Sequence, residues 1–303
     1  MNRTESEESL LLAQDNSPSR SGNYRNCRII ALFVGVLTLL TVSCLTEFLI
    51  NHNNKSPDSD KIHYSHYDYY VYAQQWPASL CKSINETHHG TCNKVPKMVN
   101  TWAIHGLWPS KAHPKHYGPF NCNSSWPFDF NQIKPFINEM EEYWPNLMQN
   151  KEDDSFWKHE WEKHGTCACQ IGDEEDGFGC KREADYFKKA LEIQKDLDFT
   201  NKIENNPKIK ISDKIEDTAP FSEIEKTLGS GRYQCYQPEK GVYQVLAQVM
   251  VCLDKKFNRV KCEDYESPFY NQKVLGDFDT GPYNPGTCSQ KLPVMIYPIH
   301  MPM

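Results

Sequence analysis

The sequence of 303 residues is long enough for one or two domains. Its formal net charge of −7 at pH 7 excludes the basic excess that is typical of proteins that bind nucleic acid at neutral pH. The 11 histidines alter this balance under acid, because their reference pKa is about 6.5. Adding eleven positive charges to −7 gives up to +4 near pH 5, so the binding of anionic ligands should strengthen in an acidic compartment.

Residues 1–28 form a short tail that contains a candidate sorting signal. In the stretch ESEESLLLAQ, Glu7 precedes Leu11 and Leu12 with the spacing of an acidic dileucine signal for endosomes and lysosomes. Matches this short arise often by chance, and the position on a short tail is what gives this one weight. Sorting adaptors are the partners that such a motif would bind.

Residues 29–50 form a predicted membrane segment. As a helix its 22 residues span about 33 Å, enough for the bilayer core of about 30 Å. Arg20, Arg25 and Arg28 precede it, so the positive-inside rule leaves residues 1–28 in the cytosol and the rest in a lumen. A cleaved signal peptide, followed by secretion, is the alternative. Because its n-region would be unusually long and no clean A-x-A site follows, we favour an uncleaved type II signal anchor.

Beyond the membrane segment, polar residues 51–64 are interpreted as a stalk and residues 65–303 as a single lumenal domain. Ten of the twelve cysteines follow residue 80, and an even number past a membrane segment indicates an oxidising compartment and disulfides rather than free buried thiols. Three N-x-S/T sequons predict glycosylation, beginning at Asn54, Asn85 and Asn123.

The predicted secondary structure has strands at both ends of the lumenal domain and helices between them. Strands are predicted over 67–75, 101–106, 242–252, 257–262 and 293–299. Helices are predicted over 131–143, 155–164, 181–198 and 219–228. Strands, then a helical block, then strands again indicate an α+β fold.

The run FWKHEWEKHGT, which overlaps the second predicted helix, 155–164, gathers titratable side chains on one predicted helix. At about 100° per residue, four of them fall at roughly 0°, 40°, 100° and 140° and share one face. These are His159, Lys163, Glu160 and His164. Gly165 follows and suits a helix C-terminus. A proton donor and acceptor beside a fixed cation suit attack at a phosphate.

Two other interpretations of this run were weighed. A charged helix face is usually a solvated surface, but Phe156, Trp157 and Trp161 suggest a half-buried element. The run also resembles the zinc motif H-E-x-x-H, whose histidines are four apart. His159 and His164 are five apart, which splays them by about 140° on an α-helix. We therefore expect no metal and no cofactor.

A second segment, TWAIHGLWPS, places His105 near the end of the strand predicted over 101–106. There a side chain is able to project into a cleft. A single histidine in such a position is more often a buried core residue. The combination with the helical run is what points to a functional site.

Together the two segments resemble the two active-site segments of the ribonuclease T2 family, the acid endoribonucleases of lysosomes, vacuoles and secretions. A third stretch, YDYYVYAQQWPASLC, resembles the family's first strand and QQWP signature. The resemblance covers about residues 65 to 300. It implies a catalytic domain with a mainly antiparallel sheet and helices packed on one side.

The resemblance also implies a chemistry for RNA, which carries its own nucleophile in the 2′-OH. His164 would be the general base and His105 the general acid, although the two roles could be reversed. Glu160 and Lys163 would stabilise the pentacovalent phosphate, and His159 would help to bind it. The product would be a 2′,3′-cyclic phosphate, which water then opens to a 3′-phosphate.

Base recognition is expected to be weak. Trp108 resembles the family's base-stacking residue, and stacking contributes about 1–3 kcal/mol per base with little sequence preference. Ser110 stands where some members have an aspartate that contacts the base. Tyr117 is a candidate for a second stacking face. Gln74 or Gln75 would contact a base, or alternatively bond only to the backbone of its strand.

The resemblance further implies a disulfide framework of Cys81–Cys92, Cys122–Cys167, Cys235–Cys288 and Cys252–Cys262, which leaves Cys169 for Cys180. A catalytically idle binding glycoprotein is a competing function, but both active-site histidines, Glu160 and Lys163 are present. A self-incompatibility or toxin-like ribonuclease is another, and the membrane anchor argues against it. We expect a monomer.

Overall fold

The computed structural model divides the chain into two compact units, Met1–Ile62 and His63–Met303. All residues that the structure describes belong to the second unit. They are 67–88, 92, 95–112, 118–148, 153–171, 178–262 and 286–300. Among them no helix is long and apolar enough to cross a membrane.

Several predictions fall outside the described residues and remain predictions. They are the tail 1–28 with Glu7, Leu11 and Leu12, the anchor 29–50, the stalk 51–64, Asn54 and Tyr117.

A seven-stranded sheet forms the centre of the domain, with five strands in the order β2-β1-β4-β3-β6. Two short strands, β5 and β7, also pair with β4, and only the β4–β7 pairing is parallel among the described strands. The strands are β1 (Tyr69–Gln75), β2 (Ala103–Ser110), β3 (Arg232–Tyr236), β4 (Gln244–Leu253), β5 (Arg259–Val260), β6 (Gly286–Thr287) and β7 (Val294–Met295).

The two central strands are buried along their whole length, which fits their apolar sequences. Alternate residues of β1 face opposite sides of the sheet, as strand geometry requires. Tyr70 and Tyr72 belong to the main core, together with the helices, whereas Val71 and Ala73 pack with Trp108 in a second cluster. The sheet therefore has an apolar layer on each face.

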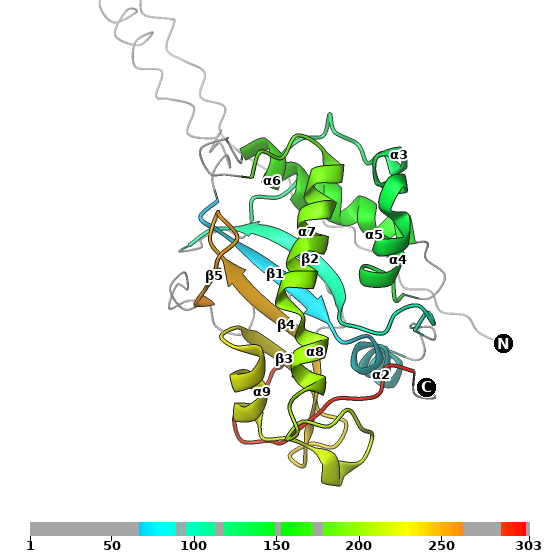
Figure 1. Ribbon diagram of the computed structural model, residues 1–303, viewed down its shortest axis with the longest axis vertical. Helices are drawn as coiled ribbons and strands as arrows, with labels where there is room; N and C mark the ends of the chain where they lie inside the picture. The colour runs from blue at the N-terminus through cyan, green and yellow to red at the C-terminus, as the bar shows by residue number, and fades with distance from the viewer. Residues whose placement is uncertain are drawn as a thin grey trace, which may run out of the picture. The chain divides into compact units, whose positions relative to one another are not determined.

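The helices lie mostly between β2 and β3 in the chain, with α2 between β1 and β2 (Figure 1). They are α2 (Pro77–His88), α3 (Phe130–Ile133), α4 (Ile137–Tyr143), α5 (Asp153–Glu160), α6 (Thr166–Ile171), α7 (Glu183–Leu197), α8 (Phe199–Glu204) and α9 (Phe221–Leu228), with 3₁₀ turns η2 (Lys134–Phe136) and η4 (Ile215–Asp217) and the π-turn η3 (Trp161–Gly165).

The longest of these helices, α7, crosses one face of the sheet (Figure 1). Tyr186 donates its hydroxyl to the Leu107 carbonyl at 3.0 Å, and Tyr72 donates to the Ala190 carbonyl at 2.9 Å. These bonds fasten the helix to β2 and β1. The expected α+β fold, with a mainly antiparallel sheet and helices on one side, is confirmed.

Some elements were not predicted. Helix α2 begins directly after β1, at Pro77, and proline at the first helical position was the available signal. Strand β3, with the sequence RYQCY, is short and mixes polar with aromatic residues, so alternation alone did not reveal it. It lies beside β4, which supplies most of its neighbours.

Five disulfides join the described residues, and they are the four pairs that the family resemblance implies and the fifth pair left by elimination. They are Cys81–Cys92, Cys122–Cys167, Cys169–Cys180, Cys235–Cys288 and Cys252–Cys262.

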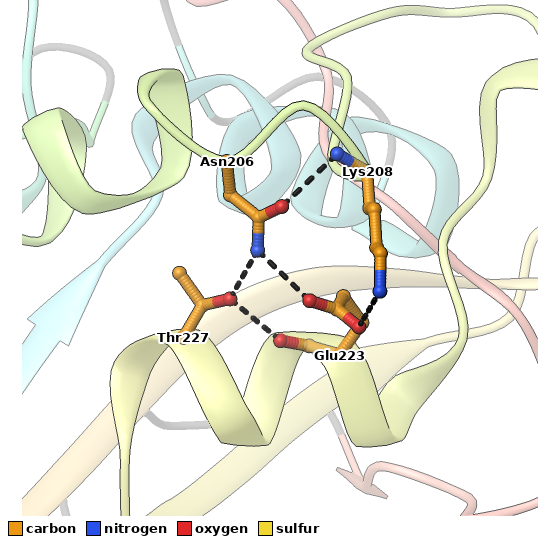
Figure 2. Close-up of polar contacts among 4 residues, drawn as sticks. All are labelled: Asn206, Lys208, Glu223 and Thr227. Carbon is orange, nitrogen blue, oxygen red and sulfur yellow. Dashed lines mark hydrogen bonds and ion pairs between the residues drawn. The ribbon is translucent and has the colours of Figure 1, made fainter.

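Polar contacts organise the connection between α8 and α9 (Figure 2). Asn206 donates through Nδ2 to Glu223 Oε1 at 3.1 Å and to Thr227 Oγ1 at 2.7 Å. Its carbonyl oxygen accepts from the Lys208 amide at 3.0 Å. One side chain thus ties the turn after α8 to two successive turns of α9.

Candidate active site

His105 occupies a β-bulge in β2. Ala73 pairs with Gly106 and Gln74 pairs with Ile104, which makes His105 the extra residue between them. A bulge re-aims side chains and is common beside active sites. The prediction that the strand ends at residue 106 is wrong, because pairing with β1 continues to Ser110.

The His105 side chain is buried among aromatic and amide groups. Its Nδ1 lies 2.7 Å from Gln248 Oε1. Its ring meets Trp108 edge to face, with centroids 4.9 Å apart, and lies 5.9 Å from Phe156 of α5. The histidine is thereby held between the sheet and helix α5.

The helix that carries Glu160, Lys163 and His164 does not end at Gly165, contrary to the prediction. It continues through η3 into α6, and the Thr166 amide bonds to the Trp161 carbonyl five residues earlier. A Cβ at Gly165 would come closer than 3.0 Å to the Trp161 ring, and Tyr186 lies nearby at 3.0 Å. Glycine here permits close packing and does not terminate the helix.

The π-turn changes the geometry of the predicted face. In a π-helical turn each backbone hydrogen bond spans five residues instead of four. The α-helical angles assigned to His159 and His164 therefore do not hold across η3. Within the described part of the chain, no group of three or more His, Cys, Asp or Glu is arranged to hold a metal.

The loop before α3 packs against this turn. The Asn121 amide donates to the Lys163 carbonyl at 2.9 Å, and the neighbouring Cys122 is bonded to Cys167 of α6. The Phe120 ring meets His164 edge to face at 5.5 Å. The loop therefore fixes one side of the His164 imidazole.

Trp108 joins the two sequence segments. Its Nε1 donates to Glu160 Oε2 at 2.9 Å, and both side chains are 1% exposed. Its ring lies 5.5 Å from the His164 ring. A Cβ at Gly106 would come closer than 3.0 Å to both partners of this hydrogen bond. Glycine at this position thus makes room for the Trp108–Glu160 contact.

The structure brings the four predicted catalytic residues into one region, although with unequal exposure. His105, Glu160 and His164 are buried, at 3%, 1% and 2% exposed. Lys163 is half-buried, and its Nζ lies 5.5 Å from the centre of the Phe120 ring. His159 is also half-buried on α5.

The predicted base-contacting residues Gln74 and Gln75 are both buried. Gln75 donates to Gln248 Oε1 at 3.3 Å, so its described hydrogen bond goes to a side chain and not to its own strand. Gln74 is 1% exposed and pairs with two core residues, Ile104 and Val249. Its amide has no hydrogen-bond partner among the described residues.

The contacts made by two other residues were not predicted. Ser110 is buried and donates to the carbonyl of Trp108, two residues away, at 3.1 Å. Gln248 contacts His105, and the available signal was a glutamine inside the apolar run of β4. A polar residue within a fully buried strand needs a partner, which identifies it as a candidate for the site.

Comparisons with known proteins identify the class to which this chain belongs. The family model described as Ribonuclease T2 family matches residues 67–262. The chain therefore belongs to the ribonuclease T2 family and is an endoribonuclease of that type.

Individual relatives cover most of the chain. It is 33% identical to Ribonuclease Oy of Magallana gigas, over 77% of this chain and 98% of the relative. It is 33% identical to Ribonuclease T2 of Homo sapiens, over 67% of this chain and 74% of the relative. Among solved structures it is similar to RNase NT in complex with 5′-AMP, with a TM-score of 0.56 and 26% identity, over 77% of this chain and 99% of that one. Human RNase T2 gives a TM-score of 0.54 at 26% identity, over 77% and 99%.

Proposed function

We propose that the chain cleaves single-stranded RNA at acidic pH by attack of the 2′-OH on the adjacent phosphate, without a metal ion. The observation that carries this proposal is that the rings of His105 and His164 both pack against Trp108, at 4.9 and 5.5 Å. Two imidazoles at one site can act as a proton acceptor and a proton donor.

In the first step His164 removes the proton of the 2′-OH, whose oxygen attacks phosphorus. His105 gives a proton to the 5′-oxygen as its bond to phosphorus breaks. The products are a 2′,3′-cyclic phosphate and a free 5′-OH. Water then opens the ring with the two histidines in exchanged roles, leaving a 3′-phosphate. The first step is a lyase-type transphosphorylation, and the second is a hydrolysis.

The remaining residues of the helical cluster act on the phosphate. Lys163 is half-buried next to His164 in the sequence. Its positive charge therefore stabilises the negative charge of the phosphorane. Glu160, oriented by Trp108, completes the set of groups that stabilise the phosphorane. His159, one residue before Glu160, is the additional phosphate-binding residue.

Base preference is low in this proposal. Trp108, Tyr117, Gln74 and Gln75 remain the candidates for base contacts. The Trp108 ring is covered in this structure, so stacking on a base requires its neighbours to move aside. Ser110 directs its hydroxyl to the Trp108 carbonyl, which makes it a poor substitute for a carboxylate that would select one base.

The proposed location is the lumen of a lysosome or vacuole, reached as a type II membrane protein through residues 29–50. Glu7, Leu11 and Leu12 would bind sorting adaptors, and Asn54, Asn85 and Asn123 would carry glycans. The acidic compartment agrees with the charge change of the histidines. Retention of the full-length protein in membranes after a carbonate wash tests the anchor. A mature N-terminus just after residue 44 would show signal cleavage instead.

The chemistry is tested with a short RNA, the same sequence as DNA, and RNA in which every 2′-OH is methylated. Each is incubated with the full-length protein in EDTA at pH 5. We expect cleavage of the unmodified RNA alone, with cyclic-phosphate ends detected by mass spectrometry. Cleavage of DNA or of methylated RNA, or loss of activity in EDTA, would refute the proposal.

A further inference from the structure

Three glutamines from neighbouring strands form a chain of hydrogen bonds that ends at His105. Gln248 of β4 donates through Nε2 to Gln234 Oε1 of β3 at 2.6 Å. Its Oε1 accepts from Gln75 Nε2 of β1 at 3.3 Å and lies 2.7 Å from His105 Nδ1. All three glutamines are buried.

The direction of these hydrogen bonds determines which atom of the Gln248 side-chain amide faces His105. Because its Nε2 donates to Gln234, its carbonyl oxygen is the atom that lies against His105. An amide oxygen only accepts hydrogen bonds. His105 Nδ1 therefore has to carry the hydrogen, both in the neutral ring and in the imidazolium.

We infer that Gln248 is a positioning residue that holds His105 in its Nδ1–H form, and that Gln234 fixes the orientation of the Gln248 amide. The effect on catalysis rests on the proposed function. In that reaction His105 Nε2 gives its proton to the 5′-oxygen as the P–O5′ bond breaks. The neutral ring that remains already has Nδ1–H, so Nε2 is ready to take a proton from the attacking water.

A neutral partner also suits an enzyme that works in acid. A carboxylate at the position of Gln248 would favour the imidazolium and raise the pKa of His105, since opposite charges this close stabilise each other. An amide oxygen orients the ring without adding that charge. Gln248 thus supports proton release by His105 at acidic pH.

The test compares Gln248→Leu and Gln248→Glu in the full-length protein with wild type, through the pH dependence of kcat and kcat/KM on a short RNA. Gln248→Leu removes the acceptor, and we expect kcat to fall about 10- to 100-fold across the pH range with little change in KM. Gln248→Glu keeps an acceptor, so turnover should persist, with the limb set by His105 moved upward by about 1 to 3 pH units.

Gln244 offers a matched control on the same strand. It is fully buried, and its amide donates to the carbonyls of Ser289 and Leu292 and accepts from the Ser289 amide. Gln244→Leu should lower thermal stability and leave both limbs of the pH profile in place. Circular dichroism establishes that each variant is folded.

Nitrogen-15 spectra of the wild-type protein with labelled histidine read the tautomer without any RNA. We expect neutral His105 to carry its hydrogen on Nδ1. Observation of the Nε2–H tautomer, or a Gln248→Glu variant that cleaves RNA with an unshifted profile, would overturn the inference. If wild type leaves RNA uncut, the proposed function fails, while the tautomer result still decides whether Gln248 orients His105.

Discussion

The indole of Trp108 and the carboxylate of Glu160 form a buried hydrogen bond of 2.9 Å that joins β2 to the last residue of α5. This bond links the two segments that the sequence identifies separately. Hydrogen bonds to a charged partner contribute about 1.5–3 kcal/mol. The placement of Glu160 therefore depends on a residue predicted only to stack on a base.

Trp108→Phe keeps an aromatic ring but removes the N–H donor. We expect kcat/KM on RNA to fall about 10- to 100-fold, which corresponds to the loss of a hydrogen bond to a charged group. The effect should not add to that of Glu160→Ala, because Trp108 then has no carboxylate left to orient. Steady-state kinetics of the two single variants and the double variant measure this coupling.

Trp76→Phe is the matched control. Trp76 is equally buried and donates to the Tyr297 carbonyl at 2.7 Å. Its loss should lower thermal stability without a comparable change in catalysis. Additive effects of Trp108→Phe and Glu160→Ala would show that the hydrogen bond does not orient Glu160.

Gly106→Ala tests the same contact without altering either partner. The new Cβ would come closer than 3.0 Å to Trp108 Nε1 and Glu160 Oε2, so the bond has to open. Overpacking of this kind costs about 1–3 kcal/mol of stability, and we expect an activity loss similar to that of Trp108→Phe. Gly286→Ala, where nothing lies within 4 Å of the added Cβ, should be nearly neutral. Unchanged kinetics for Gly106→Ala would count against the account.

Sequence patterns predicted the elements whose secondary structure depends mainly on their own residues. The apolar runs of β1 and β4 predicted both central strands, and the titratable run predicted one helix that carries His159, Glu160, Lys163 and His164. The placement of His105 close to that helix was predicted from the family resemblance. Such features depend on local composition and on recognised motifs.

Features that depend on packing between elements were not predicted. The bulge at His105 is defined by its pairing with β1, and no local residue demands it. Gly165 indicated a helix end, but Trp161 and Tyr186 pack against its backbone and the helix continues. The burial of Trp108 and the contact of Gln248 with His105 likewise involve segments far apart in the chain.

Glu183 should make the protein more stable in acid than at neutral pH. Burial raises the pKa of this carboxyl to about 7, although the hydrogen bond from the Asp129 amide opposes the shift. A raised pKa means that the contribution is complete below the unfolded value of 4.5 and is lost as pH rises through about 7. The shift corresponds to a loss of up to about 3 kcal/mol.

Thermal unfolding of Glu183→Gln at pH 5 and pH 8 measures this contribution. We expect the variant to lose much of the wild-type difference between the two conditions, because the amide does not ionise. Glu192→Gln, on the exposed side of the same helix, should retain that difference. A Glu183→Gln variant with the full wild-type pH dependence would contradict the assignment.

The central claim is that His105 and His164 divide proton transfer at one phosphate. Its most direct test is the turnover of His105→Ala and His164→Ala on ordinary RNA and on RNA whose scissile 5′-oxygen is replaced by sulfur, a leaving group that needs no proton. On ordinary RNA each variant should lose about 10²–10⁴-fold in kcat. On the sulfur substrate His105→Ala should recover most of its activity and His164→Ala should not. Near-wild-type turnover of either variant on ordinary RNA would contradict the account, and recovery of His164→Ala alone would reverse the two roles.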